Sequence, residues 1–574
     1  MSRLAVSTHA SGPSNLSAMP NFLETIFAQL QRSANRVVLR EIHGEQFVSA
    51  TGTELLEQVR TVRAYLRNAG LRPGDRCALL APNSIRWAVF DLALMAERMI
   101  VVPLYARQSP AELATMMKDS EPKLLLAGDA NLADLAVQAW TSGTSKPPRR
   151  VLLDEVLRQK VPGQPAPGAP NARPDSDIVT IIYTSGTSGE PKGVCLTSAN
   201  VAHMLSCTTE RLDQLMGKSR EPDRVFHYAP FNFAASWILL LSCLSRESVL
   251  TLSTDLTKLA DEIRLSAPHY FLNVPTLLER VRRGVEDALS KRAAPIRLLH
   301  AKAQAAWQRH KLGSARAADA LWLALGRKLI FSKIKERFGP HIRALICGSA
   351  PLVPETQQFF LMLGIPVLQA YGLTETTAIC TLDDPRVPVE PGYVGQAIRG
   401  IEMQITENEE IIVRGPHIFA GYWNRPEETA RVLRDGWFHT GDQGEVNARG
   451  NWRIIGRIKN LIILNSGHNV PPEPIEDKIA QHLPAAQQIV IVGNGRGYLC
   501  VLIAGPVEHG AAKSALDVVN PGLPHYRQVR NFAVVRETFT PENGLLTVNG
   551  KLRRDAINAR FAAEINSMYD RKPS

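Results

Sequence analysis

The sequence predicts an α/β protein: a large N-terminal region with mixed and parallel sheets flanked by helices, and a small α+β C-terminal domain. Two observations predict this fold class. Apolar strand-like segments alternate with helical ones, as at residues 77–81, 87–96 and 99–104, which is the rhythm of βαβ units. After Gly456 the strands become short and antiparallel in character, with residues 488–492 and 498–504 on either side of a glycine-rich turn.

The order of these segments along the chain sets the expected domains. Residues 123–127 and 151–153 extend the first sheet, and a connector with five prolines follows at 161–177. Strand and helix then alternate to about residue 455, interrupted by a basic helical stretch at about 279–338. We therefore expect a disordered N-terminal tail at 1–20, a large domain at 21–457 and a small mobile C-terminal domain at 458–574.

Size and charge narrow the classes of function. A chain of 574 residues needs several packed subdomains. Its net charge of +11 suits an anionic membrane surface or polyanionic small ligands. The basic residues occur throughout the chain and form no continuous basic tract. We therefore expect no nucleic-acid partner.

Cysteine usage and hydropathy bear on the compartment. The seven cysteines are scattered and none forms a CxxC pair, which argues against a disulfide framework or structural zinc and favours the cytoplasm. Residues 1–20 lack the apolar segment of a secretory signal. The most apolar run, residues 237–244, is far shorter than the ~20 residues that span a bilayer. We expect no transmembrane segment, while peripheral contact with a membrane stays open.

The strongest motif is residues 181–193, IIYTSGTSGEPKG, in which an apolar strand runs into two glycines, four hydroxyl side chains and a lysine. The glycines let backbone N–H groups wrap an anion, the hydroxyls donate hydrogen bonds, and the lysine adds positive charge. The alternative is a flexible surface turn, and the similar string at 141–146 shows that composition alone does not exclude it. That second string lacks the preceding strand and the second glycine, so context favours a phosphate loop at 181–193. The loop residues are Thr184, Ser185, Gly186, Thr187, Ser188, Gly189 and Lys192.

This loop is similar to the phosphate loop of the adenylate-forming superfamily, which includes acyl-CoA synthetases, luciferases and the adenylation domains of peptide synthetases. The order of the later motifs resembles that superfamily over about residues 21–561. The resemblance implies an enzyme that uses ATP and Mg²⁺ to form an acyl-adenylate, with catalytic roles for Thr184 and Lys192. It also implies that a turn after the strand at 344–346 packs against adenine. This turn consists of Gly348, Ser349, Ala350 and Pro351.

A second motif, residues 369–376 (QAYGLTET), combines an aromatic ring, a glycine, a hydroxyl and a carboxylate. Tyr371 offers a face for base stacking, Thr374 can contact phosphate, and Glu375 is a hard oxygen ligand suited to Mg²⁺ held by ATP. The alternative is a helix N-terminus with ordinary capping residues, which the phosphate loop disfavours. The predicted nucleotide contacts are Gln369, Ala370, Tyr371, Gly372, Leu373 and Thr374.

Two strand ends and a C-terminal segment supply the remaining charged groups. Asp442 has the chemistry to accept both ribose hydroxyls, although a turn aspartate is the alternative. The resemblance implies that Ile454 lies against the nucleotide and that Arg457 reaches ribose or phosphate. It also places the catalytic lysine at Lys551, within residues 543–554 (NGLLTVNGKLRR). A mobile cation there neutralises the charge of an in-line displacement, whereas the alternative for one basic residue in a basic tail is a solvated face.

The resemblance further implies a domain movement. Lys459 falls at the hinge on which the small domain swings between an adenylating and a thioester-forming pose. Ser466, Gly467 and His468 resemble the stretch beside the pantetheine tunnel. Gly467 is the position where a side chain would obstruct the thiol.

The identity of the acid rests on fewer residues. An insertion ending at residues 328–339 resembles that of long-chain acyl-CoA synthetases and favours a long-chain fatty acid. Phe231, Phe233 and Trp237 line an apolar acyl pocket or belong to the core, and Phe233 stands where the family often has histidine. The basic insertion lies against anionic lipid or is an ordinary surface helix, and the second alternative is favoured.

The leading hypothesis is a fatty acid–CoA ligase that releases AMP and pyrophosphate. The alternative is a fatty acyl-AMP ligase or acyl–carrier-protein synthetase, which loads a phosphopantetheine carrier instead of coenzyme A. A non-catalytic nucleotide- or lipid-binding scaffold is disfavoured because the chain combines all the charged groups of the reaction. These are Lys192, Glu375, Asp442, Arg457 and Lys551.

Overall fold

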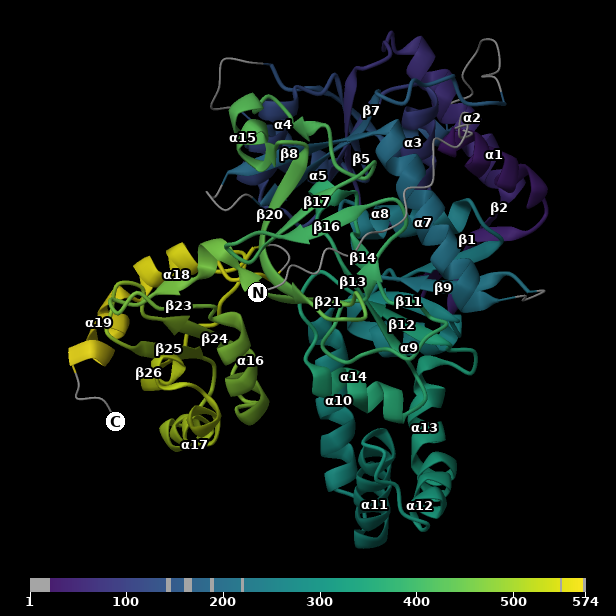
Figure 1. Cartoon of the computed structure of the whole chain (residues 1–574). Coiled ribbons are helices and arrows are strands. Elements are labelled where there is room, and N and C mark those ends of the chain that lie inside the picture. The colour runs from purple at the N-terminus through teal and green to yellow at the C-terminus, as the bar shows by residue number, and fades with distance from the viewer. Residues whose placement is uncertain are drawn as a thin grey trace.

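The structure, a computed structural model, describes residues 21–140, 146–158, 168–185, 190–217, 221–547 and 550–570. The predicted tail at 1–20, loop residues Gly186, Thr187, Ser188 and Gly189, and residues 548–549 beside Lys551 lie outside the described residues. Figure 1 shows two large sheets side by side, a helical projection, and a C-terminal lobe beside them.

The first sheet has seven strands and carries the phosphate loop. Its order is β18-β8-β7-β4-β3-β5-β6, and the strands from β7 to β6 are parallel. The strands are β3 (Arg76–Leu80), β4 (Ile100–Leu104), β5 (Leu124–Ala127), β6 (Arg149–Leu152), β7 (Ile178–Ser185), β8 (Pro191–Thr197) and β18 (Gly421–Tyr422). The helices between them are α3 (Ile85–Ala96), α4 (Pro110–Ser120), α5 (Ala130–Gln138) and α6 (Leu153–Arg158). Every residue of α3 except Arg86 is buried, which confirms the predicted βαβ core.

The second sheet has nine strands in the order β15-β14-β13-β12-β11-β9-β10-β1-β2. Its strands are β1 (Val37–His43), β2 (Gln46–Thr51), β9 (Asp223–His227), β10 (Ser248–Leu252), β11 (Tyr270–Asn273), β12 (Ala344–Cys347), β13 (Val367–Tyr371), β14 (Thr381–Leu382) and β15 (Gln396–Ala397). Its helices are α1 (Phe22–Arg32), α2 (Gly52–Asn68), α7 (Ser198–Met216), α8 (Ala234–Leu244), α9 (Leu259–Ser266) and α14 (Pro354–Met362). Because β1 and β9 to β13 run parallel, the turns after β12 and β13 leave the sheet at the same edge.

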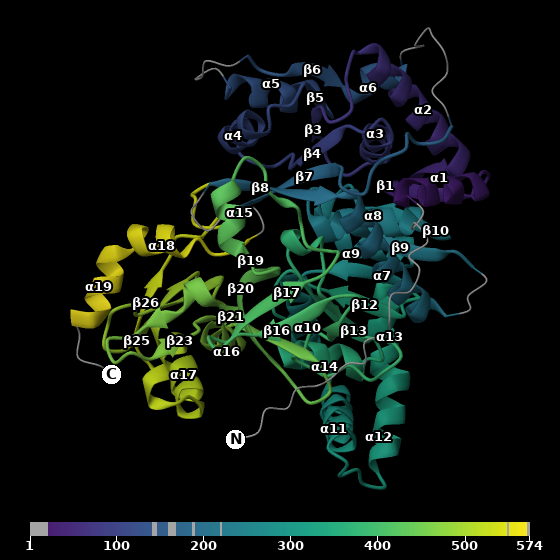
Figure 2. The ribbon, with the colours of Figure 1, turned by 45° about the horizontal axis from the view of Figure 1, so that its top comes forward.

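A third, antiparallel sheet lies between these two and the C-terminal lobe. Its order is β16-β17-β20-β19, and β21 also pairs with β20. The strands are β16 (Glu402–Ile405), β17 (Glu410–Arg414), β19 (Leu433–Arg434), β20 (Trp437–Val446) and β21 (Trp452–Arg457), with α15 (Pro426–Val432) beside them. Strand β20 is long, and Asp442 in its middle pairs with Arg457, the last residue of β21 before the C-terminal lobe, so this part of β20 lies at the junction between the two parts (Figure 2).

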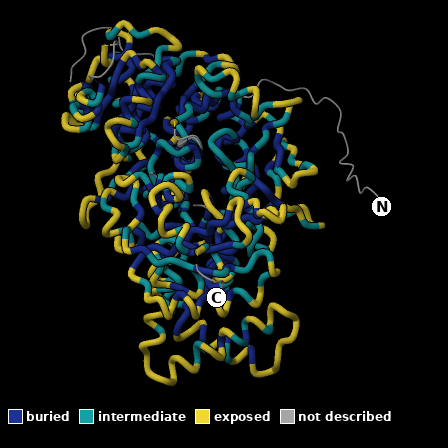
Figure 3. Tube along the Cα trace, turned by 90° about the vertical axis from the view of Figure 1, so that its left-hand side faces the viewer, coloured by how far each residue is buried: buried dark blue, intermediate teal, exposed yellow. Residues whose placement is uncertain are grey.

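The helical projection confirms the predicted insertion. It consists of α10 (Pro275–Ser290), α11 (Ala294–Lys311), α12 (Asp319–Gly326), a π-helical segment (Arg327–Phe331) and α13 (Ser332–Lys335). Helices α11 and α12 pack together at its end, away from the sheets (Figures 1 and 2). Figure 3 shows that its outer part is largely exposed.

The C-terminal lobe is a small α+β unit with its own hydrophobic cores. It contains the hairpin β22 (Ile462–Ile463) and β23 (Asn469–Val470), and a three-stranded sheet of β24 (Gln488–Val492), β25 (Leu499–Ala504) and β26 (Val529–Val535). Its helices are α16 (Glu473–His482), α17 (His509–Val519), α18 (Arg554–Arg560) and α19 (Ala562–Asp570). The fold class predicted for the chain is therefore confirmed.

Two further expectations concern cysteines and membranes. All seven cysteines are buried free thiols. Within the described ranges, no helix combines the length and the apolar character that crossing a bilayer requires.

Candidate active site

The predicted phosphate loop joins two antiparallel strands of the first sheet. Thr184 and Ser185 end β7, and Thr184 pairs with Lys192 on β8. Gly186 to Gly189 stay predictions because they lie outside the described residues. The pairing nevertheless fixes both ends of the loop against the parallel sheet, at the carboxyl edge where α/β folds bind ligands.

Lys192 is held over the site by groups that sequence reasoning missed. Its amino group forms an ion pair with Glu428 and lies 5.4 Å from the ring centroid of Tyr422. The Tyr422 hydroxyl donates a hydrogen bond of 2.8 Å to Glu375 Oε1. Burial and the neighbouring Glu375 raise the pKa of Tyr422, so the phenol stays a donor. The lysine and the predicted magnesium ligand therefore both contact one tyrosine.

The segment that carries Tyr422 ties the loop to the second motif. β18 pairs with β8, and Trp423 N donates to Gly193 O at 2.7 Å. Phe419 N donates to the backbone oxygen of Glu375 at 2.9 Å. The sequence signal that could have found this connection is the Gly421-Tyr-Trp run, which comes shortly after strand-like residues.

The second motif forms a tight turn after β13. A Cβ added at Gly372 would lie 2.3 Å from Ala378 O, so only glycine fits there. Thr377 and Ala378 have φ angles of 52° and 105°, which non-glycine residues rarely adopt. This strained turn fixes Thr374 and Glu375 in a 3₁₀ turn directly after the strand.

Asp442 and Arg457 form the best-defined pair of the site. They are register partners on β20 and β21, and Arg457 Nε lies 2.6 Å from Asp442 Oδ1. The Tyr371 hydroxyl donates to Asp442 Oδ2 at 2.7 Å. Burial raises the Asp442 pKa, while the positive charge of Arg457 and the tyrosine hydrogen bond oppose that shift. Ile454 packs with Tyr371 against one small apolar cluster, so this predicted group comes together.

The predicted adenine turn and the second motif differ in exposure. Gly348 is buried, and a Cβ there would lie 3.2 Å from Ala370 O, whereas Ser349, Ala350 and Pro351 are exposed and able to face a ligand. Gln369 is instead buried, because its Nε2 donates to Gln357 Oε1 and Tyr393 O, both at 2.9 Å. This side chain is bonded within the core, and a nucleotide contact of Gln369 stays a prediction.

Lys551 reaches the site from the C-terminal lobe. A turn closed by Thr547 N to Lys551 O at 2.7 Å presents it beside Gly550. Lys551 keeps exposed surface, yet the surrounding protein desolvates its amino group and, with the positive charge of Arg457, lowers its pKa. Asp442 and Glu375 act on the same amino group in the opposite direction. The structure therefore brings four charged groups from three distant segments within electrostatic reach of one another.

Direct contacts hold the lobe in this orientation. Arg553 Nη2 lies 3.0 Å from Glu112 Oε1 on α4. At the other end of the lobe, Gln481 Nε2 donates to Glu355 Oε2 at 3.3 Å. The first contact places the start of α18 and the Lys551 turn against α4 of the first sheet, and the second joins α16 to α14 of the second sheet.

The predicted hinge residue lies beside the site, whereas the predicted thiol-tunnel residues lie elsewhere in the C-terminal lobe. Lys459 is exposed on a 3₁₀ turn that follows β21, next to Asn460, whose Nδ2 donates to Glu473 Oε1 at 2.7 Å. Gly467 has a φ angle of 81° and open space where a Cβ would point. Ser466 Oγ is 2.9 Å from His468 Nδ1, and the His468 ring stacks on Tyr526 of the same lobe. In this orientation Lys551 lies within electrostatic reach of Asp442 and Glu375, whereas Ser466, Gly467 and His468 are exposed.

The three aromatic residues proposed for the acyl pocket differ in environment. Phe231 and Trp237 are fully buried, and Trp237 Nε1 donates to Asp91 Oδ2 at 2.8 Å, so both have the core environment named as the alternative. Phe233 is half-buried before α8, with its ring centroid 6.3 Å from that of Tyr105. A lining role stays a prediction.

The donor set fits a magnesium ion carried by phosphates. Across the described part of the chain, no cluster of three or more His, Cys, Asp or Glu side chains is placed to hold a metal ion. Glu375 accepts a hydrogen bond from Tyr422, whose ring lies under Lys192, and its charge acts on Lys551. Mg²⁺ is commonly bound by one or two carboxylates together with substrate phosphates, and this site offers that arrangement.

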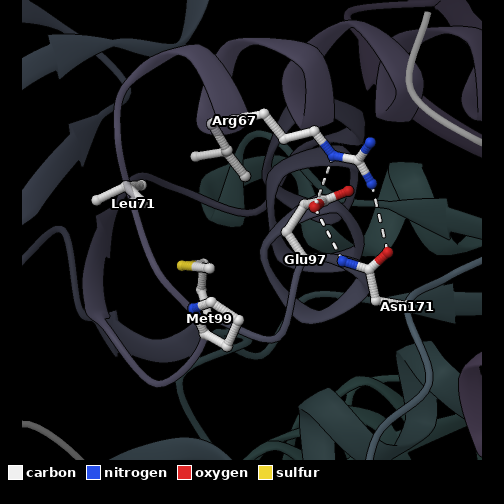
Figure 4. Close-up of a pocket in the computed structure, with 7 residues that line it drawn as sticks. Arg67, Leu71, Glu97, Met99 and Asn171 are labelled. Carbon is white, nitrogen blue, oxygen red and sulfur yellow. Dashed lines mark hydrogen bonds and ion pairs between the residues drawn. The ribbon is translucent and has the colours of Figure 1, made fainter.

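A separate small pocket, of about 170 Å³, is not this site (Figure 4). The pocket lies at the start of β4, beside Met99, whereas Thr184 lies at the end of β7. Because β4 and β7 run parallel, the pocket and Thr184 are at opposite edges of the sheet. Glu97 Oε2 there accepts from Arg67 Nε at 2.9 Å and from Asn171 Nδ2 at 3.0 Å. Its polar groups are therefore already bonded to one another.

Comparisons with known proteins agree with this geometry. Residues 26–423 match the AMP-binding enzyme family, and residues 459–573 match the AMP-binding enzyme C-terminal domain. The chain is 26% identical to the long-chain-fatty-acid–CoA ligase FadD15 of Mycobacterium bovis, covering 96% of this chain and 97% of that protein. It is 31% identical to the putative fatty-acid–CoA ligase fadD11 of Mycobacterium tuberculosis, covering 68% and 74%. It is 26% identical to the chloroplastic long-chain-fatty-acid–[acyl-carrier-protein] ligase AEE15 of Arabidopsis thaliana, covering 94% and 85%.

Solved structures share the fold. The A domain of carboxylic acid reductase from Segniliparus rugosus, in complex with AMP and a co-purified carboxylic acid, superposes with a TM-score of 0.74 at 21% identity, covering 96% of this chain and 94% of that one. The o-succinylbenzoate coenzyme A synthetase of Bacillus subtilis, in complex with ATP and a magnesium ion, gives 0.70 at 20% identity, covering 93% and 98%.

Proposed function

The chain belongs to the AMP-binding enzyme family of adenylate-forming enzymes, and from this membership we propose that it activates a long-chain fatty acid with ATP and transfers the acyl group to coenzyme A. The observation that carries the proposal is the convergence of Lys551 with Arg457, Asp442 and Glu375. These groups have charges suited to one nucleotide, its metal ion and a carboxylate.

In the first half-reaction, a carboxylate oxygen of the acid attacks the α-phosphorus of ATP. The new P–O bond forms as the bond to the β-phosphate oxygen breaks, and pyrophosphate leaves with its electron pair. Asp442 is proposed to accept the ribose hydroxyls, and Lys551 to neutralise charge on the α-phosphate and the carboxylate. Lys192 and the loop hold the departing phosphates. Glu375, together with the phosphates, would hold Mg²⁺, which would supply charge neutralisation.

In the second half-reaction, the thiol sulfur attacks the acyl carbon of the adenylate. A thioester forms, the bond from acyl carbon to phosphate oxygen breaks, and AMP leaves while the thiol proton passes to solvent. The described orientation presents Lys551, so this step requires the lobe to turn about the segment of Lys459 and to bring the Gly467 turn to the site.

The choice of acid and of acceptor follows the relatives. FadD15 is named as a long-chain fatty-acid–CoA ligase and aligns over nearly the whole of both chains, whereas AEE15 is named as a ligase for acyl carrier protein. Coenzyme A is the proposed acceptor, and a phosphopantetheine carrier is the second candidate. Seven free buried thiols agree with the cytoplasm as the proposed compartment.

An acid and acceptor panel tests the proposal. Pyrophosphate exchange into ATP is measured without any thiol across fatty acids of increasing chain length. Product formation is then measured with coenzyme A or with phosphopantetheinylated carrier protein. We expect exchange with long-chain acids and thioester with coenzyme A. If none of the fatty acids supports exchange, the proposed substrate is contradicted. If thioester forms with carrier protein but not with coenzyme A, the second candidate is favoured.

A further inference from the structure

The helical projection has a charge distribution unlike that of the rest of the chain. Residues 290–335 contain eleven Lys and Arg and one acidic residue, so this segment carries nearly all of the net charge of +11. The acidic residue, Asp319, is already engaged, because its Oδ2 accepts from Arg309 Nε at 3.0 Å and from Arg316 N at 2.8 Å. Helix α10 adds three acidic and three basic residues, and its Asp287 pairs with Lys291, so the excess of positive charge remains within the whole projection.

Most of these cations are exposed and make no ion pair with any residue that the structure describes. They are Arg292, Arg297, Lys302, Lys311, Arg316, Arg327, Lys328 and Lys333. Lys311 instead lies 5.1 Å from the ring centroid of Trp307, a half-buried tryptophan on the same helix.

Large apolar side chains are exposed among these cations. Leu312 is 80% exposed, the highest value among the large apolar residues of the described chain, and Leu321 is 59% exposed. Five of the fourteen exposed large apolar residues of the described chain lie in this segment: Ile296, Leu298, Leu312, Leu321 and Leu329. Leu312 follows α11 directly and Leu321 lies in the first turn of α12, so both belong to the outer end of the projection.

The projection is firmly packed from within. Ala303 and Ala306 of α11 are buried together with Leu323 and Gly326 of α12. A Cβ added at Gly326 would lie 2.7 Å from Ala303 Cβ, so the two helices are in close contact. The exposed leucines are therefore not spare core residues of a loose segment, since a compact core already exists beneath them.

We propose that the outer end of this projection docks the enzyme on an anionic lipid surface, with Leu312 and Leu321 entering the interfacial layer and the surrounding Lys and Arg contacting lipid phosphates. An anionic bilayer interface stabilises both features, because leucines enter its interfacial layer and cations contact its phosphates. A nucleic acid would use the cations and leave the leucines in water. The inference does not depend on the reaction proposed above, and it reverses the expectation of an ordinary surface helix.

Flotation of the full-length protein with large unilamellar vesicles tests this proposal. One vesicle set is phosphatidylcholine alone and the other contains phosphatidylglycerol at about 30 mol%. We expect association with the anionic set, little with the neutral set, and loss in about 0.5 M NaCl, because the electrostatic part is screened.

Two pairs of variants separate the leucines and the charges from general effects. Leu312→Ser/Leu321→Ser is expected to lower the partition coefficient about tenfold or more, whereas the control Val387→Ser/Val518→Ser changes valines of 58% and 59% exposure elsewhere. Arg316→Glu/Lys328→Glu is expected to lower it at least about 25-fold, since each basic side chain near an anionic surface contributes about fivefold. Arg60→Glu/Arg264→Glu makes the same change in net charge on other exposed helices. Thermal melting verifies folding of all four variants.

The proposal is overturned if the wild-type protein does not float with the anionic set, or floats equally with both sets. It is also overturned if the control variants lose as much binding as the projection variants. Retention on an immobilised acidic protein or on single-stranded DNA, without vesicle binding, would assign the charge to another class of partner.

Discussion

Asp442 and Arg457 face each other across two antiparallel strands, and Arg457 Nε lies 2.6 Å from Asp442 Oδ1. The other carboxylate oxygen accepts the Tyr371 hydroxyl at 2.7 Å. Both oxygens of Asp442 are therefore oriented before a nucleotide arrives. An incoming ribose meets an acid whose position is already fixed, which reduces the conformational cost of binding.

Removing one member of this pair is expected to destabilise the protein more than removing both. Asp442→Asn leaves the Arg457 charge, and Arg457→Gln leaves the Asp442 charge, without its charged partner. Removing one partner of a buried ion pair costs about 3–5 kcal/mol of stability, and we expect a value at the lower end of this range because Arg457 is half-buried. Melting temperatures of the single and double variants without nucleotide measure the coupling. Glu445 and Arg453, paired on the same strands but about half exposed, form a matched control with coupling near zero to 1 kcal/mol. Equal coupling in both pairs would contradict the assignment.

Tyr422→Phe tests the link between Glu375 and Lys192. The variant keeps the ring under Lys192 but removes the hydroxyl that donates to Glu375 at 2.8 Å. We expect kcat for pyrophosphate exchange to fall about tenfold, with a higher magnesium concentration for half-maximal rate, because Glu375 is no longer oriented. A magnesium titration of the exchange rate measures both. An unchanged magnesium requirement would remove Tyr422 from this role, and Tyr526→Phe in the C-terminal lobe serves as control.

The rate of adenylation is expected to fall at high pH earlier than an ordinary lysine would allow. Desolvation and the charge of Arg457 lower the Lys551 pKa, so the required ammonium form is lost below the usual value of about 10.4. Asp442 raises that pKa, so Asp442→Asn removes a negative charge and shifts the basic limb to still lower pH. A pH profile of residual pyrophosphate exchange measures the shift. If the basic limb of the pH profile does not shift in Asp442→Asn, or shifts equally in Glu445→Gln, Lys551 is not the titrating group.

The ion pair between Glu112 and Arg553 is expected to favour the adenylating orientation. Its atoms are 3.0 Å apart and each side chain is about one-third exposed, so its coupling is at most about 1 kcal/mol, or about fivefold. Arg553→Ala should therefore slow pyrophosphate exchange up to about fivefold, while thioester formation from supplied acyl-adenylate stays level or rises. Arg560→Ala, on the following helix, is the control. Equal slowing of both half-reactions would show that the pair does not select between orientations.

Periodicity predicted most of the fold because local pattern and tertiary environment agree. The βαβ rhythm of residues 77–104 became β3, α3 and β4, and the change after Gly456 became the α+β lobe. The loop ends, Glu375, Asp442, Arg457 and Lys551 were also named from sequence, since each directly follows a strand or lies in a recognisable motif. The domain boundaries and the roles of these residues stay predictions.

Contacts that depend on long-range pairing could not be predicted. Tyr422 and Glu428 reach Lys192 only because β18 pairs with β8, more than two hundred residues earlier in the chain. Gln369 resembled a ligand residue by position, but its amide is bonded in the core. The basic character of the projection was predicted from the sequence, but which of its leucines stay exposed depends on how α11 and α12 pack.

The central claim is that Lys551 serves one half-reaction at a site it shares with Asp442 and Glu375. Lys551→Ala should reduce pyrophosphate exchange by about 10²–10³, a loss typical of removing one transition-state charge partner, while thioester formation from supplied acyl-adenylate and coenzyme A stays within about threefold of wild type. Lys513→Ala, an exposed lysine of the same lobe, should change neither. Undiminished exchange in Lys551→Ala, or equal loss of both half-reactions, would contradict the account.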